Sequence, residues 1–294
     1  MRTMALAESQ RSSAVISLGE LFNGQESVSG KSPLSYEALA DEAVRGGWPA
    51  LLESPVDQAV EFNRAYCEDL YRTHIPDATG ARHQPERLRR VFASLARNLS
   101  TEASINALAA DVGADGPSID ARTVRSYLDA FAAVFAIEPL PAWSVNLRSR
   151  SRVRQLAKLQ LADPSLACAA LGVDPARLAR DPEYFGFVFE AMAVRDLRVY
   201  AEQDGGRVYH YRDNTGLEVD TVIERPDGQW AGIEVKLGGR AVEVGERNLL
   251  KLRDGRVAED RAGAAAFLAV LTGTEYAYTL PSGVHVIPLA TLAA

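Results

Sequence analysis

The sequence predicts an α+β protein, in which a helical N-terminal part is followed by an α/β domain with a mixed sheet. Between residues 35 and 137, apolar residues recur mainly at helical spacing. After residue 161, one long helical stretch leads into short runs in which apolar and polar residues alternate, as they do in strands. We therefore expect a helical part and a separate part that contains the sheet.

The helical part starts with two helices between Ser35 and Thr73, separated by a tight corner at residues 45–49. Three further helices are expected at residues 86–98, 101–112 and 121–137. Ser100 or Thr101 is suited to cap the second of them, and Asp120 the third. The order helix, helix, turn, helix is typical of a helix-turn-helix, and the extended residues 138–143 are a candidate wing, so a winged-helix-like domain is predicted.

The α/β part begins with a helix at Tyr184–Ala201. Three short strands are expected to follow it, at residues 208–212, 218–224 and 231–237. A helix at residues 246–253 precedes an apolar strand at residues 264–271, which should be central and buried, and the chain ends in a hairpin around Pro281-Ser282-Gly283.

Composition limits the possible functions. Apolar residues make up 47% of the chain and charged residues 24%, as in ordinary globular proteins. The net charge of −7 argues against nucleic-acid binding over the whole surface, although a local basic region remains compatible with it. Cys67 and Cys168 are too few for a zinc site or a disulfide framework. Since no apolar run approaches the ~20 residues that span a bilayer and no signal peptide is evident, we expect a cytoplasmic protein with no membrane partner.

Charged side chains are expected to converge on two neighbouring strands. Side chains alternate along a strand, so Glu234 and Lys236 share one face. On the preceding strand Glu218 and Asp220 likewise share a face, opposite Val219 and its alternating neighbours, and pairing across the turn would place Asp220 beside Glu234. Two carboxylates and a lysine would then meet.

Glu190 is a third candidate carboxylate. Its helical neighbours are all non-polar, namely Gly186, Phe187, Ala193 and Val194, so the pattern points the carboxylate toward the interior. A buried carboxylate needs a cation or hydrogen-bond donors, and a bound metal or Lys236 would supply them. A glutamate in such a position is, however, more often paired with an arginine.

This set suits phosphodiester hydrolysis. Asp220, Glu234 and Glu190 would hold Mg²⁺ or Mn²⁺, with Asp220, Glu234 and Lys236 as the catalytic residues. The metal would activate water, and Lys236 would orient it or stabilise the transition state. The alternative is that Glu234 and Lys236 have no catalytic role, because a strand of this kind usually has one solvated face and one buried face.

The order helix glutamate, strand aspartate, turn, strand Glu-x-Lys resembles the PD-(D/E)XK nuclease superfamily, in which these residues form the metal site. More closely, residues 186–190, 209–212, 216–220 and 233–236 resemble a domain of unknown function that lies C-terminal to the ATPase in many bacterial and archaeal AAA-type ATP-binding proteins. Residues 45–49 and 163–166 are also similar to that family. The resemblance implies a restriction-endonuclease-like fold for the α/β part.

The resemblance also has a clear departure. In that family an ATPase domain precedes these elements, whereas here residues 1–24 resemble only its last strand and exit, and we expect the ATPase core to be missing. Residues 24–32 resemble a phosphate-binding loop, but five residues separate Gly24 from Gly30 where the motif has four, and Pro33 follows directly. We therefore expect no ATP site in this chain. The predicted segments are an ATPase exit remnant at 1–34, a helical linker at 35–79, the winged-helix-like domain at 80–160 and the nuclease-like domain at 161–294.

A basic stretch lies at the end of the winged-helix-like domain. Arg148, Arg150, Arg152 and Arg154 occupy every second position, and no acidic residue occurs between Glu138 and Asp163. In an extended strand these arginines would form one positive edge, and with Arg122 and Arg125 they are candidates for contact with a nucleic-acid backbone. The alternative is an edge strand that the arginines keep soluble.

Two functions remain open from the sequence. The first is a nucleic-acid-associated protein, in particular a metal-dependent nuclease, with DNA as the expected partner. The second is a non-catalytic DNA-binding or protein-interaction module left from an AAA-type ATPase, with a protein partner such as an ATPase. In the second case the same charged residues would form a structural ion cluster.

Overall fold

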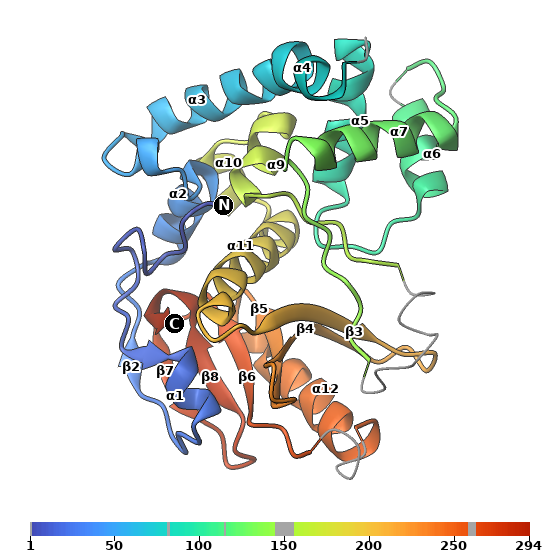
Figure 1. Cartoon of the computed structure of the whole chain (residues 1–294). Helices are drawn as coiled ribbons and strands as arrows, with labels where there is room; N and C mark the ends of the chain where they lie inside the picture. The colour runs from blue at the N-terminus through green and yellow to red at the C-terminus, as the bar shows by residue number, and fades with distance from the viewer. Residues whose placement is uncertain (1, 81–82, 115, 145–155, 258–262) are drawn as a thin grey trace. The chain divides into compact units, whose positions relative to one another are not determined.

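The computed structural model describes residues 2–80, 83–114, 116–144, 156–257 and 263–294. The chain forms two compact units, and each is described by itself. The sheet unit comprises Met1–Leu39, Leu140–Gln155 and Met192–Ala294, and the helical unit comprises Ala40–Pro139 and Leu156–Ala191. Within the described residues the structure is α+β with a mixed sheet, as predicted (Figure 1).

The helical unit is built from short helices. The described helices that lie wholly or partly in it are α2 (Tyr36–Arg45), α3 (Val56–Asp69), a π-helical turn (Leu70–His74), α4 (Ile75–Thr79), α5 (Pro85–Arg97), α6 (Ile105–Ala114), α7 (Ala121–Ala133), α9 (Pro164–Leu171), α10 (Pro175–Ala179) and the start of α11 (Pro182–Glu202). The predicted corner is confirmed, since α2 ends at Arg45 and a 3₁₀ turn, Pro49–Leu51, follows.

Aromatic packing holds α5 and α7 together. The rings of Phe92 and Phe131 lie 4.8 Å apart between their centroids, and Tyr71 contacts both edge-on. All three side chains are buried. Their large apolar surfaces make this cluster a main source of stability for the helical unit.

Helices α6 and α7 differ at one end or both from the helices predicted at residues 101–112 and 121–137. The cap of α6 is Ser104, whose hydroxyl accepts the amide of Ala107 at 3.1 Å, so the prediction of Ser100 or Thr101 is wrong. Those two residues pair instead with Leu159 through backbone hydrogen bonds. α7 is capped by Asp120 as predicted, but it ends at Ala133 rather than at residue 137, because Phe135 adopts a left-handed backbone with φ 57°.

The sheet unit contains a mixed sheet, which has seven strands within the described residues. In spatial order they are β2 (Gly30–Lys31), β7 (Tyr276–Thr279), β8 (His285–Pro288), β6 (Phe267–Thr272), β5 (Trp230–Lys236), β4 (Glu218–Glu224) and β3 (Arg207–Arg212). β6 is parallel to both of its neighbours, β5 and β8, and the other pairs are antiparallel. The short strands β1 (Ile16–Ser17) and β9 (Leu292–Ala293) pair separately.

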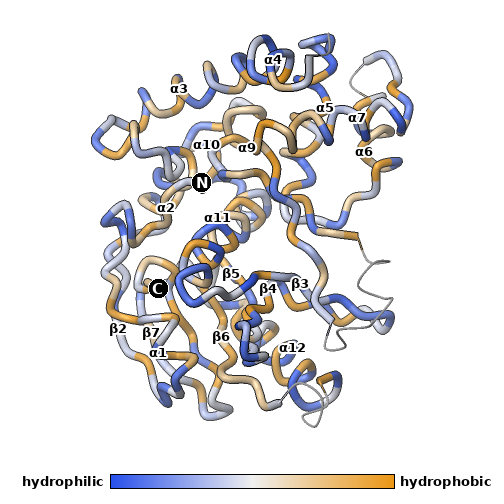
Figure 2. The backbone as a smooth tube through the Cα atoms, viewed as in Figure 1, coloured by the Kyte–Doolittle hydropathy of each residue, from blue (hydrophilic) through white to orange (hydrophobic). Residues whose placement is uncertain are grey.

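The apolar strand β6 is central and fully buried, as predicted, and Figure 2 colours it hydrophobic. The predicted terminal hairpin is confirmed by the antiparallel pair β7 and β8. Helix α12 (Val242–Gly255) packs on β4, β5 and β6, and it is longer at both ends than the sequence pattern indicated (Figure 1). Its buried leucines, Leu249 and Leu252, join Trp230 and Val270 in one core cluster.

The edge strand β3 is covered by a short extended segment. The amide of His210 donates to the carbonyl of Pro141 at 2.9 Å, and the carbonyl of His210 accepts the amide of Trp143. The indole of Trp143 then lies 5.2 Å from that of Trp230 in the core cluster. The predicted extended segment is therefore confirmed at these residues, and it protects part of an otherwise open sheet edge.

In the described residues, no helix has both the length and the apolar character that crossing a membrane requires.

Candidate active site

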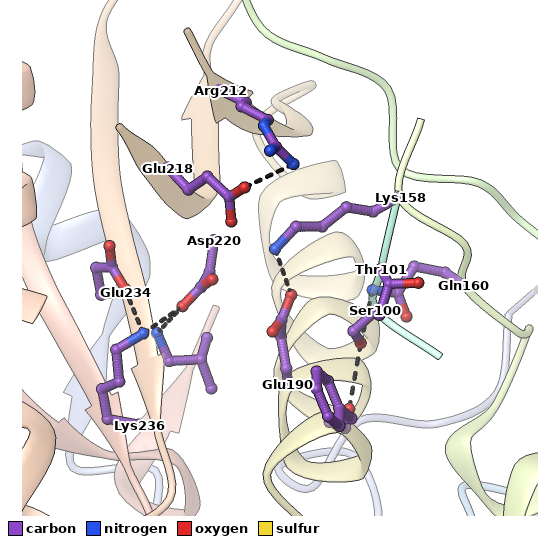
Figure 3. Close-up of polar contacts among 12 residues, drawn as sticks. Ser100, Thr101, Lys158, Gln160, Glu190, Arg212, Glu218, Asp220, Glu234 and Lys236 are labelled. Atoms are coloured by element: carbon purple, nitrogen blue, oxygen red, sulfur yellow. Dashed lines mark hydrogen bonds and ion pairs between the residues drawn. The ribbon is translucent and has the colours of Figure 1, made fainter. Parts of the chain in front are cut away.

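The side chains of Asp220, Glu234 and Lys236 meet in the sheet unit, as the sequence predicted (Figure 3). Asp220 lies on β4 and the other two lie on β5. The ammonium of Lys236 is 2.8 Å from Oδ2 of Asp220 and also contacts Oε2 of Glu234. Glu234 is almost completely buried, whereas the other two side chains remain partly accessible to solvent. The cluster is therefore buried at Glu234 and accessible to solvent at its rim, which Asp220 and Lys236 form.

A β-bulge places Asp220. Tyr209 of β3 pairs with Val222 of β4, and Tyr211 pairs with Val219, so Asp220 and Thr221 together lie opposite the single residue His210. The regular alternation that the sequence predicts along β4 is interrupted here. Bulges re-aim side chains and are common beside active sites.

The carboxylate of Asp220 also takes part in strand pairing. Regular pairing between β4 and β5 runs from Glu224 with Trp230 as far as Thr221 with Ile233. Beyond that point, Oδ2 of Asp220 accepts the backbone amide of Val235 at 2.9 Å. The side chain thus fixes the end of β5 directly next to Lys236.

Helix α12 approaches Glu234 closely. The side-chain amide of Asn248 donates to Oε1 of Glu234 at 3.0 Å. A Cβ atom on Gly245 would lie 3.2 Å from the Cβ of Glu234 and 3.2 Å from Cγ2 of Val270. The absence of a side chain at position 245 is what lets the helix come this near.

Burial and the neighbouring Asp220 raise the pKa of Glu234 well above its ordinary value, although Lys236 acts in the opposite direction. Burial opposes the charge of Lys236, but the two carboxylates outweigh it and raise the pKa of Lys236 above its ordinary value. The ammonium therefore stays charged, while the buried carboxylate resists ionisation. A divalent cation would relieve this repulsion between carboxylates.

Glu190 points to the interior, as predicted, but its described ion-pair partner was not foreseen. Glu190 lies in the helical unit, where Oε1 accepts the ammonium of Lys158 at 2.8 Å (Figure 3). Both side chains are buried. Close by in the chain, Gln160 donates to the hydroxyl of Ser100 at 3.1 Å, and that hydroxyl donates to the carbonyl of Phe187. Participation of Glu190 in a metal site stays a prediction.

The predicted nucleic-acid contacts are described only in part. Arg122 and Arg125 are exposed in the first turns of α7. Arg148, Arg150, Arg152 and Arg154 lie outside the described residues. His210 is a fully buried residue of β3.

The two motifs at residues 45–49 and 163–166 contact each other in the helical unit. The buried carboxylate of Asp163 accepts the backbone amides of Gly47 and of Ser165, both at 2.9 Å. The indole of Trp48 donates to the hydroxyl of Ser165 at 3.1 Å. These residues serve the packing of α9 against the corner after α2.

The donor set at Asp220 and Glu234 fits a magnesium-type ion. Within the part of the chain that the structure describes, no group of three or more His, Cys, Asp or Glu side chains is placed to hold a metal. Mg²⁺, however, commonly binds through one or two carboxylates and completes its shell with water and substrate phosphate oxygens. Two adjacent carboxylates suffice for that mode of binding.

Sequence reasoning missed Gly245 and Asn248 beside the cluster in the sheet unit, and Lys158 beside Glu190 in the helical unit. Gly245 lies just before the helix expected at residues 246–253, so the signal of a glycine inside a helix, which often marks close packing, is present only once the helix is extended to Val242. Asn248 lies three residues later and hence on the same helix face. Lys158 carried no such signal, since its contact with Glu190 joins residues far apart in the chain.

Comparison with known proteins finds two matches to family models. Residues 36–177 match a domain of unknown function, DUF8612, and residues 185–292 match another, DUF4143. No curated protein and no solved structure matches the chain at a significant level. The DUF4143 match is compatible with the expected resemblance to the C-terminal domain associated with AAA-type ATP-binding proteins. The chain is thus similar to two domains of unknown function in succession.

Proposed function

We propose that the sheet unit carries a divalent-metal-dependent nuclease site of the PD-(D/E)XK type, with Asp220 and Glu234 as metal ligands and Lys236 as the assisting cation. The observation that carries the proposal is the meeting of two carboxylates and an ammonium at the end of β5, with one carboxylate buried and resistant to ionisation. Strongly perturbed charged groups gathered at one point are typical of functional sites. Glu190, which pairs with Lys158 in the helical unit, is not counted among these ligands.

The chemistry follows from the residue types. A bound Mg²⁺ or Mn²⁺ would polarise the phosphate and lower the pKa of a coordinated water. Asp220 and Glu234 would hold the ion through their carboxylates. Lys236 lies between the two carboxylates and is partly accessible, so its ammonium is available to a phosphate oxygen at the rim.

The winged-helix-like region is proposed as the nucleic-acid contact. α5, α6 and α7 follow the helix, helix, turn, helix order, and the exposed Arg122 and Arg125 lie at the start of the last helix. Arginines at the start of such a helix are suited to contacts with phosphates. Binding of this kind weakens steeply with salt.

Cleavage of labelled DNA and RNA, single-stranded and double-stranded, tests the proposal. The wild type is expected to cut at least one substrate with Mg²⁺ or Mn²⁺ and not with EDTA. Asp220→Asn and Lys236→Met should each lower the rate by at least about 100-fold, as loss of a central group does. Glu218→Gln is the matched control, because Glu218 lies on the same strand but pairs with Arg212 at 2.7 Å. Cleavage that survives in both variants would contradict the proposal.

A second candidate is a non-catalytic interaction module associated with an ATPase. The observation in its favour is that the cluster is internally satisfied: Glu234 is held by Lys236 and Asn248, and Asp220 by Lys236 and Val235. A cluster with a purely structural role would show the same contacts. In that case no substrate is cut with any divalent ion, and Asp220→Asn affects stability alone.

A further inference from the structure

The two oxygens of the Glu234 carboxylate have different partners, one on helix α12 and one on strand β5. Oε1 accepts the side-chain amide of Asn248 at 3.0 Å, and Oε2 contacts the ammonium of Lys236 (Figure 3 shows the Lys236 side). The carboxylate is therefore fixed in rotation about its last bond. Because Asn248 binds Oε1, the oxygen that contacts Lys236 is Oε2.

The contact depends on how near the helix lies. Gly245 is on the same face of α12 as Asn248, and a Cβ at position 245 would meet the Cβ of Glu234 at 3.2 Å. Leu249 and Leu252 anchor the same helix in the core cluster. Asn248 is thus held by a rigid element rather than by a loop.

We infer that Asn248 is the positioning residue of the site: it orients Glu234 so that one carboxylate oxygen is presented to the point shared with Asp220 and Lys236. The inference rests on the proposed metal-dependent function. Asn248 itself does not touch the reacting atoms; it acts through Glu234.

The choice of an amide is chemically significant. A lysine or arginine at position 248 would also donate to Oε1, but its charge would cancel the negative charge that a cation needs. The asparagine amide donates a hydrogen bond and is neutral. It therefore orients the carboxylate without placing a second positive charge beside it, and such orientation is the usual role of groups that hold metal ligands in place.

Mn²⁺ binding to the full chain tests the inference. Asn248→Ala and Asn248→Leu remove the donor, the second at similar volume, and should weaken Mn²⁺ affinity by about 10-fold or more, measured from the electron paramagnetic resonance signal of free Mn²⁺. Asn248→Gln retains an amide donor and should recover part of the affinity. Val244→Ala, at an exposed position of the same helix, is the control and should bind as the wild type does. A purely structural role for Asn248 would lower stability equally in the Ala and Gln variants and leave the affinity of the folded protein unchanged.

Metal-free crystal structures of the wild type and Asn248→Ala supply a second readout. The expected result is a rotated Glu234 that no longer directs Oε2 at Lys236. An unchanged Glu234 together with unchanged Mn²⁺ affinity would overturn the inference. Absence of Mn²⁺ binding in the wild type would overturn the proposed function, and the orientation of Glu234 in the two metal-free structures would then decide the role of Asn248 alone.

Discussion

Asp220 binds Lys236 through the same oxygen, Oδ2, that accepts the backbone amide of Val235, at 2.8 Å and 2.9 Å respectively. One carboxylate thus fixes both the end of strand β5 and the side chain that follows. A bulge in β4 at Asp220 makes this possible, because it interrupts regular strand pairing. The site is therefore formed where the sheet departs from regularity.

Replacement of Glu234 by glutamine should change how stability depends on pH. Burial and the neighbouring Asp220 raise the pKa of Glu234 in the folded state. The folded protein therefore binds more protons than the unfolded chain, and this residue's contribution to stability is present below its ordinary pKa and is lost as pH rises through the folded-state pKa. Relative to the wild type, Glu234→Gln should gain stability with rising pH, by at most about 1.4 kcal/mol per pH unit.

Urea unfolding between about pH 5 and about pH 8 measures this difference. Glu218→Gln removes an exposed carboxylate of the same strand pair and should follow the wild type. A constant difference between Glu234→Gln and the wild type across the range would show that the pKa of Glu234 is not raised.

The buried pair of Lys158 and Glu190 should be strongly coupled. Lys158→Met removes one ion-pair partner of the buried Glu190 carboxylate, and breaking a buried pair from one side typically costs about 3–5 kcal/mol. The double variant Lys158→Met with Glu190→Gln removes both charges and should lose much less stability than Lys158→Met alone. Chemical denaturation of the wild type, both single variants and the double variant gives the coupling energy. If the two single losses simply add, the pair is not coupled in the folded protein.

Gly46 should be intolerant of any side chain. Its backbone is left-handed with φ 76°, and an added Cβ would lie 2.5 Å from Oδ1 of Asp163. Gly46→Ala should cost at least about 3 kcal/mol, from backbone strain and overpacking together. Gly172 is the matched control, because it is also left-handed, with φ 64°, but has open space around its Cβ position. Gly172→Ala should cost only about 1–2 kcal/mol in thermal or urea unfolding, and equal losses at the two positions would refute the packing argument.

Short-range patterns predicted much of the fold and of the candidate site. Strand alternation placed Glu234 and Lys236 on one face, and helical spacing turned Glu190 to the interior. The Asp120 cap and the central, buried β6 also follow from local sequence. Each of these features depends on residues that are close together in the chain.

What the sequence did not reveal depends on contacts between distant residues. The bulge at Asp220 is defined by pairing with β3, so the alternation within β4 gave no sign of it. Asn248 and Lys158 reach their carboxylates only after packing of separate elements. The early end of α7 depends on the backbone of a single residue, Phe135, against the local helical pattern.

Stabilisation by Mn²⁺ tests the central claim most directly. After the dissociation constant has been measured, urea unfolding of the wild type and Asp220→Asn is compared without Mn²⁺ and with Mn²⁺ at about 100 times that constant. If Asp220 and Glu234 bind the ion, the wild type should gain about 2.7 kcal/mol and Asp220→Asn should gain almost nothing. Equal gains in both proteins, or none in the wild type, would contradict a metal site at Asp220.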